Sequence, residues 1–195
     1  MNSYYEDYPA MAQSWGWMVE MGTHLLRLMS GGVFDRHPDL KIVVGHIGEL
    51  IPFGLDRINR GLTMGSLLAA ESKKAGPAQQ WAMQKSVRYY MRQNVVITTS
   101  GVLDQAALSC AIEDPGIDNI LFSADDPFGD NFEAIYFLKN AKLSAEDRNK
   151  LAHGNAERVL KLAQNIGACK RSVGFLSPAG ARARARVARK LLSFW

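Results

Sequence analysis

Cysteine and long apolar runs are scarce in this 195-residue sequence. The two cysteines, Cys110 and Cys169, lie far apart and fit neither a CxxC pair nor a zinc-binding spacing, so we expect inert thiols in a reduced, cytoplasmic protein. Charged residues interrupt every apolar run well before the ~18–20 residues that a membrane span requires. The first residues carry no basic stretch followed by an apolar one. The sequence therefore predicts neither a signal peptide nor a membrane-spanning helix.

Basic residues are concentrated at one end of the chain. The net charge is +4, but residues 170–195 contain seven basic residues and no acidic one, which leaves residues 1–169 with 16 basic and 19 acidic residues and a net charge of −3. The hydrophobic content of 47% is typical of a globular protein and excludes general disorder. We therefore expect one domain over residues 1–169 and a separate Ala/Arg-rich tail over residues 170–195.

The tail permits two interpretations. The alternation of alanine and arginine over residues 181–186 could form a basic amphipathic segment for nucleic acid or an acidic membrane surface. It could instead be a solvated extension outside the domain. We favour this second interpretation, because residues 1–169 are mildly acidic and show no other binding motif. We therefore expect neither a nucleic acid nor a membrane as partner.

Three short apolar runs with many β-branched residues predict buried strands, at residues 40–45, 94–99 and 119–124. Helical patterns follow each run, and such alternation requires a parallel sheet with helical crossovers. The first helix, over about residues 14–34, is expected to bury one face and to end at Gly31-Gly32. That face comprises Trp17, Met21, His24, Leu25, Leu28 and Met29. The other helices are expected at about 49–60, 79–92, 103–113, 131–140, 144–152 and 154–164, with residues 61–78 as a loop or loosely helical insert.

Two of the strands end at an ionisable residue. His46 follows the first strand and Asp125 follows the third, and active sites of parallel α/β folds gather at the carboxyl ends of strands. A histidine and an aspartate there can bind a metal or transfer protons. Glu49, three residues after His46, could fix the imidazole tautomer by accepting its other N–H. Each residue alone could also be an ordinary turn residue, but their equivalent positions favour a shared site.

The motifs around these residues resemble the carboxyl-terminal part of the amidohydrolase-related decarboxylases, the group of the aminocarboxymuconate semialdehyde decarboxylase. The resemblance covers about residues 10–165. It is closest to the dihydroxybenzoate, resorcylate and carboxyvanillate decarboxylases, because Glu49 follows the His-x-Gly. The matching segments are His46-Ile47-Gly48-Glu49 with Pro52-Phe53 and Asp56-Arg57-Ile58, Ile97-Thr98-Thr99-Ser100-Gly101, Leu121-Phe122-Ser123-Ala124-Asp125 with Pro127-Phe128, and Gly154-Asn155-Ala156 with Arg158.

The resemblance implies a (β/α)₈ barrel, of which this chain holds strands six to eight, and one divalent metal, zinc or manganese. Asp125 matches the strand-eight metal ligand and the proton donor, and His46 matches the strand-six histidine that orients or shares the proton, with Glu49 as its partner. Arg57 matches an arginine that reaches the pocket of an adjacent subunit, although a solvated arginine on a helix face fits the sequence equally well. Phe53 lies in the same substrate-binding segment. The implied activity is non-oxidative decarboxylation of an aromatic or unsaturated carboxylic acid by a homo-oligomer.

The sequence departs from the family pattern in three ways. A barrel requires about 250 residues, and no His-x-His or Glu-x-His pair is present, so three of the four expected metal ligands are missing from this chain. The remaining histidines are expected to be structural: His24 packed in the core, His37 in an exposed turn and His153 at a helix junction. Asp126 also stands where relatives place Trp or Tyr.

Two alternatives to a decarboxylase remain. One is a hydrolase of the same superfamily, in which a metal-bound water attacks an amide, ester or lactone. The other is a truncated, inactive remnant that oligomerises, because strands without their neighbours leave an apolar edge.

Overall fold

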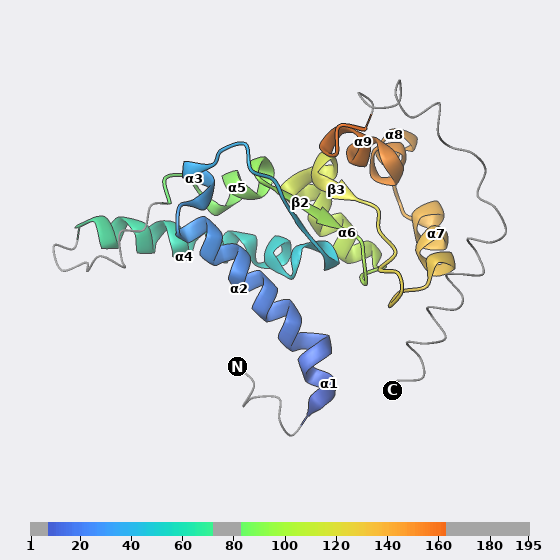
Figure 1. Ribbon diagram of the computed structural model, residues 1–195, viewed down its shortest axis with the longest axis horizontal. Coiled ribbons are helices and arrows are strands. Elements are labelled where there is room, and N and C mark those ends of the chain that lie inside the picture. The colour runs from blue at the N-terminus through green and yellow to red at the C-terminus, as the bar shows by residue number, and fades with distance from the viewer. Residues whose placement is uncertain (1–7, 72–82, 163–195) are drawn as a thin grey trace.

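The computed structural model describes residues 8–71 and 83–162, and a small parallel sheet lies at its centre (Figure 1). Its strands are β1 (Ile42–Val44), β2 (Val95–Thr98) and β3 (Ile120–Leu121), in the order β1-β2-β3. Ile42 pairs with Val95, and Ile97 pairs with Ile120, both in parallel register. These are the three predicted strands, and the arrangement is a partial α/β fold.

Helices connect the strands and flank the sheet, as Figure 1 shows. The first three helical elements, α1, η2 and α2, form one continuous rod, and α3 lies between this rod and β1. Helices α7, α8 and α9 follow β3. The helical elements are α1 (Pro9–Met11), η2 (Ala12–Gly16), α2 (Trp17–Ser30), α3 (Val33–Arg36), η3 (His46–Gly48), α4 (Ile51–Glu71), α5 (Val87–Gln93), α6 (Gln105–Ala111), η5 (Ile112–Gly116), η6 (Ile117–Asn119), α7 (Asn131–Asn140), α8 (Ala145–Asn149), η7 (Lys150–Gly154) and α9 (Asn155–Val159).

Side-chain caps begin several of these helices. The Asp130 carboxylate accepts hydrogen bonds from the backbone N–H groups of Phe132 and Glu133 at the start of α7, and Ser144 accepts one from Asp147 at the start of α8. The predicted helix over residues 131–140 is therefore confirmed, and Ser144 caps the next helix. The expected stop after the first helix is also present, because α2 ends at Ser30 and Gly32 has a φ of 65°.

The core lies on one face of the sheet. Val44, Val95, Ile97 and Ile120 belong to one buried cluster, to which the helices contribute apolar side chains. Val43, on the opposite face, is 50% exposed. A parallel sheet is usually covered on both faces, so the exposed valine marks a face that the described residues leave partly open.

The buried face of α2 differs from the predicted one. Leu25 and Met29 are buried as expected, but Trp17 is 60% and Met21 48% exposed. The reason is tertiary: a Cβ added at Gly22 would lie 3.1 Å from the backbone oxygen of Glu49, so the face containing Gly22 packs against the body. The expectation that His24 is a core residue is wrong, because its side chain is 60% exposed beside Glu20.

Two helix boundaries also differ from the predictions. The loop or insert expected at residues 61–78 is helical as far as Glu71, because good helix formers such as Leu67, Leu68, Ala69 and Ala70 outweigh two glycines. The junction expected at His153 is a π-helical turn, η7, that continues into α9 without a break. His153 itself is exposed, as is His37.

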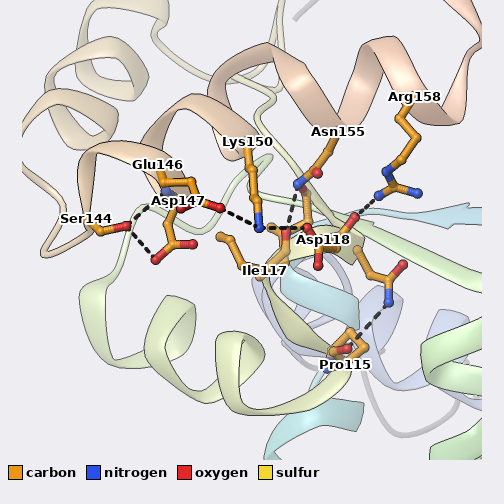
Figure 2. Close-up of polar contacts among 11 residues, drawn as sticks. Pro115, Ile117, Asp118, Ser144, Glu146, Asp147, Lys150, Asn155 and Arg158 are labelled. Atoms are coloured by element: carbon orange, nitrogen blue, oxygen red, sulfur yellow. Dashed lines mark hydrogen bonds and ion pairs between the residues drawn. The ribbon is translucent and has the colours of Figure 1, made fainter.

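The carboxyl-terminal helices are fastened to the segment that leads into β3 (Figure 2). The Asn155 side chain donates hydrogen bonds of 2.7 and 2.8 Å to the carbonyl oxygens of Ile117 and Ile120, and Asn155 is 2% exposed. Lys150 forms ion pairs of 3.3 Å with both Asp118 and Glu146, and Arg158 donates to the Asp118 carbonyl oxygen. The Gly-Asn-Ala motif is thus a structural anchor for β3.

Part of the chain lies outside the described residues. The predicted tail at 170–195, its boundary with the 1–169 domain, Cys169 and the beginning of the helix predicted at 79–92 all fall there. Within the described ranges, no helix is both long and apolar enough to cross a bilayer.

Candidate active site at the carboxyl end of the sheet

His46 lies in a left-handed turn directly after β1. Five consecutive residues, His46 to Leu50, have φ values between 52° and 74°. Four of the five are not glycine, and each such residue costs roughly 1–2 kcal/mol in this region of backbone space. Only contacts with the surroundings can maintain such a run, and backbone strain of this kind gathers at functional sites. The turn leaves the His46 side chain exposed at the end of the sheet.

The end of β2 contacts this turn through Ser100. His46 Nδ1 lies 2.9 Å from the Ser100 carbonyl oxygen, and the His46 backbone N–H faces the Ser100 hydroxyl at 3.4 Å. That hydroxyl also lies 2.7 Å from Thr98 Oγ1. The neighbouring hydroxyl of Thr99 points to the other side, where it donates to the Ser123 carbonyl oxygen and accepts from the Ser123 N–H. Residues at the end of β2 are therefore hydrogen-bonded to the segments that follow both outer strands, at His46 after β1 and at Ser123 after β3.

Asp125 follows β3 in a tight turn. Its φ is 65°, and its carbonyl oxygen accepts hydrogen bonds from the N–H groups of Phe128 and Gly129, at 2.7 and 2.8 Å. The Asp125 residue is half-buried, whereas Asp126 is exposed. The side chains of these adjacent aspartates thus have different environments.

His46 and Asp125 converge over Gly101. A Cβ atom built on Gly101 would lie 2.6 Å from His46 Nδ1 and 3.4 Å from Asp125 Oδ2. A side chain at this position would therefore clash with the imidazole, and the φ of 65° at Gly101 also favours glycine. The structure brings together the two residues that the sequence analysis placed at the ends of separate strands.

Glu49 is buried against α2, with 6% exposure. Burial raises the pKa of its carboxyl group above the ordinary value of 4.5, and the nearby His46 opposes this shift. The Glu49 backbone N–H donates to the His46 carbonyl oxygen at 3.3 Å, but among the described residues no hydrogen bond joins the Glu49 carboxylate to the His46 ring. The tautomer-fixing contact expected from Glu49 is made by the Ser100 carbonyl oxygen instead.

The two predicted substrate-binding residues lie on α4. Phe53 is 85% exposed, and Arg57 is exposed as well. In the part of the chain that the structure describes, Arg57 forms no ion pair, although Asp56 beside it pairs with Arg60 at 2.8 Å. Both side chains are therefore available to a group outside these residues, and their roles stay predictions.

The residues present do not complete a metal site. Within residues 8–71 and 83–162, no group of three or more His, Cys, Asp or Glu side chains could hold a metal ion. Asp125 and His46 supply two potential donors, while divalent metal sites in proteins commonly use three or more protein ligands.

Sequence reasoning assigned no role to Thr98, Thr99 or Ser100. The available signal was a polar run placed directly after a β-branched strand, at the end where sites form. An open surface groove also lies along α7, lined in part by Leu103 and by the exposed rings of Phe132 and Tyr136. None of the predicted site residues lines that groove.

Comparison with known proteins identifies the family. The family model described as Amidohydrolase matches residues 6–162. Decarboxylase orsB of Emericella nidulans is 34% identical over 152 residues, which are 76% of this chain and 42% of that protein.

Solved structures give the same result. The 2,6-dihydroxybenzoate decarboxylase from Rhizobium superposes with a TM-score of 0.71 at 33% identity, over 82% of this chain and 47% of the relative. A dihydroxybenzoic acid decarboxylase from Polaromonas sp., with bound manganese and the inhibitor 2-nitroresorcinol, has a TM-score of 0.71 at 32% identity, over 85% and 49%. The chain thus spans less than half the length of these relatives. It belongs to the amidohydrolase family.

Proposed function

We propose that this chain acts in the non-oxidative decarboxylation of an aromatic carboxylic acid that carries a hydroxyl group beside the carboxylate. The convergence of His46 and Asp125 over Gly101 carries the proposal, because it gives the site a proton donor and a group that can orient it. The names of the relatives, decarboxylases of dihydroxybenzoate among them, support the substrate class.

The reaction replaces one bond to a ring carbon by another. A proton from the Asp125 carboxyl group is added to the carbon that carries the carboxylate, and a C–H bond forms. The bond to the carboxylate then breaks, its electron pair restores the aromatic ring, and carbon dioxide leaves. No electrons are gained or lost overall, so the reaction requires no redox partner. His46 would orient the Asp125 carboxyl group or return a proton to it after each cycle.

The complete protein would be a (β/α)₈ barrel in which the described strands are strands six to eight. A divalent metal, zinc or manganese, would then require ligands beyond Asp125 from residues outside those described here, as the Polaromonas relative with bound manganese suggests. Because the described residues do not form that site, the proton transfer above is assigned to His46 and Asp125 alone.

The exposed α4 residues fit a homo-oligomer. An arginine without an ion-pair partner at a protein surface can bind a substrate carboxylate in a neighbouring subunit through two parallel hydrogen bonds. Arg57 would have this role, with Phe53 against the ring of the substrate and Glu49 supporting the His46 turn.

Carbon dioxide release tests the proposal. The purified chain is incubated with 2,6-dihydroxybenzoate and added Mn²⁺, and carbon dioxide and the phenolic product are measured in equal amounts. Asp125→Asn should lower the rate about 100-fold or more, because it removes the proton donor. Asp126→Asn, the exposed neighbour in the same turn, should leave the rate within about twofold, since the Asp126 side chain is exposed and accepts a hydrogen bond from Asn131 at 3.4 Å. A chain that releases no carbon dioxide contradicts the proposal.

The same preparation distinguishes the two rivals. A hydrolase would cleave an ester, amide or lactone without releasing carbon dioxide. An inactive remnant would do neither and would associate through its open sheet, for which the 50% exposure of Val43 gives a physical reason. Light scattering across a range of protein concentrations measures that association.

A further inference from the structure

The Ser100 carbonyl oxygen faces one particular nitrogen of the His46 ring. The distance from His46 Nδ1 to this oxygen is 2.9 Å. A carbonyl oxygen accepts hydrogen bonds and never donates one, so Nδ1 must carry the hydrogen. In the neutral imidazole the other nitrogen, Nε2, then has a free lone pair and can accept a proton or a hydrogen bond.

Ser100 is itself held firmly to the sheet. The residue is 7% exposed, and its hydroxyl lies 2.7 Å from Thr98 Oγ1 and 3.4 Å from the His46 backbone nitrogen. Thr98 belongs to β2 and pairs with Leu121 of β3. The hydroxyl therefore connects the central strand to the strained turn, and it limits how far the Ser100 carbonyl oxygen can move.

Other groups near His46 do not provide this orientation. Among the described residues, Glu49 makes no hydrogen bond to the imidazole, although it lies in the same turn. His46 is exposed, so packing restrains the ring only on the side that faces Gly101.

We propose that Ser100 is a positioning residue that fixes His46 in the tautomer with hydrogen on Nδ1, so that Nε2 remains the proton-accepting nitrogen of the site. The role of this tautomer in catalysis rests on the proposed function, because a defined tautomer matters only if His46 exchanges protons. The assignment of the hydrogen to Nδ1 depends only on the contacts with Ser100.

Thr99 offers a matched control. Thr99 is buried, as Ser100 is, and its hydroxyl makes two hydrogen bonds, at 2.9 and 3.0 Å, but both go to Ser123 on the β3 side. Loss of the Thr99 hydroxyl should therefore disturb the Asp125 side of the site and leave the His46 tautomer unchanged.

Nitrogen NMR of the histidine rings tests the proposal on the unmodified chain. The protein is labelled with ¹⁵N-histidine, and the His46 signals are identified by their loss in His46→Gln. At a pH where imidazole is neutral, the wild-type ring should show a protonated Nδ1 and an unprotonated Nε2. Ser100→Ala should shift both signals toward a mixture of tautomers, Ser100→Thr should restore the wild-type signals, and Thr99→Val should not move them.

Two results would overturn the inference. One is a wild-type ring with its hydrogen on Nε2, and the other is an Ser100→Ala ring identical to wild type in a folded protein. In the carbon dioxide assay we expect Ser100→Ala to be about tenfold slower, with recovery in Ser100→Thr. If the tautomer follows the prediction but the chain releases no carbon dioxide, the positioning is correct and the proposed function fails. If carbon dioxide is released and Ser100→Ala changes neither measurement, only the positioning fails.

Discussion

The carboxylates at the two ends of the parallel sheet differ in whether they have partners. At the amino end, Asp114 lies between the guanidinium groups of Arg88 and Arg92, at 2.6 and 3.0 Å, and the Tyr90 hydroxyl donates to Asp35. At the carboxyl end, the side chains of Asp125 and Glu49 have no hydrogen-bond partner among the described residues. Asp114 and Asp35 are therefore paired with cations or a hydroxyl donor, whereas Asp125 and Glu49 are not.

Backbone conformation follows the same division. The carboxyl end carries the run of positive φ from His46 to Leu50 and the positive φ of Asp125. In barrels built from parallel strands, the carboxyl end performs the chemistry and the amino end provides stability. Substitutions at the two ends should therefore separate loss of stability from loss of activity.

The largest effect on stability is expected from Asn155→Ala. The substitution leaves the carbonyl oxygens of Ile117 and Ile120 without their donor in a buried region, which should cost about 3 kcal/mol in the free energy of unfolding. Urea unfolding measures the loss. Asn149→Ala, at an exposed position at the end of α8, should cost less than about 0.5 kcal/mol. Equal losses in the two variants would show that Asn155 does not anchor β3.

A smaller loss is expected from Asp114→Asn, about 2 kcal/mol, because the variant breaks a pair of ionic contacts whose carboxylate is buried. The loss stays below that of a fully buried pair, since both arginines are about half exposed. Asp118→Asn is the matched control, because the Asp118 side chain is 65% exposed and its ion pair with Lys150 lies at the surface. The control should unfold at the same urea concentration as wild type. Neither variant should change carbon dioxide release by the folded protein.

Structural features were predictable from the sequence when they are caused by residues close together in the chain. The strands and α7 were predictable because β-branched runs and the Asp130 cap act within a few residues. The buried face of α2 was not, because it depends on Gly22 meeting Glu49. His46 and Asp125 were found from their positions after strands. The hydrogen-bond partner of the His46 ring could not be predicted, because it is a backbone carbonyl oxygen 54 residues away and every residue type has one.

At two glycines with positive φ, the same substitution should have different consequences. Gly101→Ala and Gly116→Ala should each lower stability by about 1–2 kcal/mol, because alanine is strained at φ values of 65° and 107°. Gly101→Ala also places a methyl group against the His46 ring, so its carbon dioxide release should fall about tenfold or more. A Cβ at Gly116 meets nothing within 4 Å, so the folded variant should keep its activity. Equal carbon dioxide release by the two variants would contradict a role for His46 in the reaction.

The smallest expected effect is a pH dependence that comes from Glu49. Burial raises its pKa above 4.5 in the folded chain, so the folded state holds this proton more tightly than the unfolded state. Stability from this group is therefore fully present below pH 4.5 and is lost as the pH rises through the folded pKa. Glu49→Gln has no such proton, and its advantage in melting temperature over wild type should grow from acidic to neutral pH.

Glu20→Gln is the control for this profile, because its side chain is 62% exposed on α2 and its melting curve should follow wild type at every pH. If Glu49→Gln also follows wild type, the carboxyl end carries no destabilised charge and the contrast between the two ends is weaker. If it becomes more stable at neutral pH while releasing less carbon dioxide, Glu49 is a group that lowers stability and supports activity. That combination is the one expected of a residue kept for the site and not for the fold.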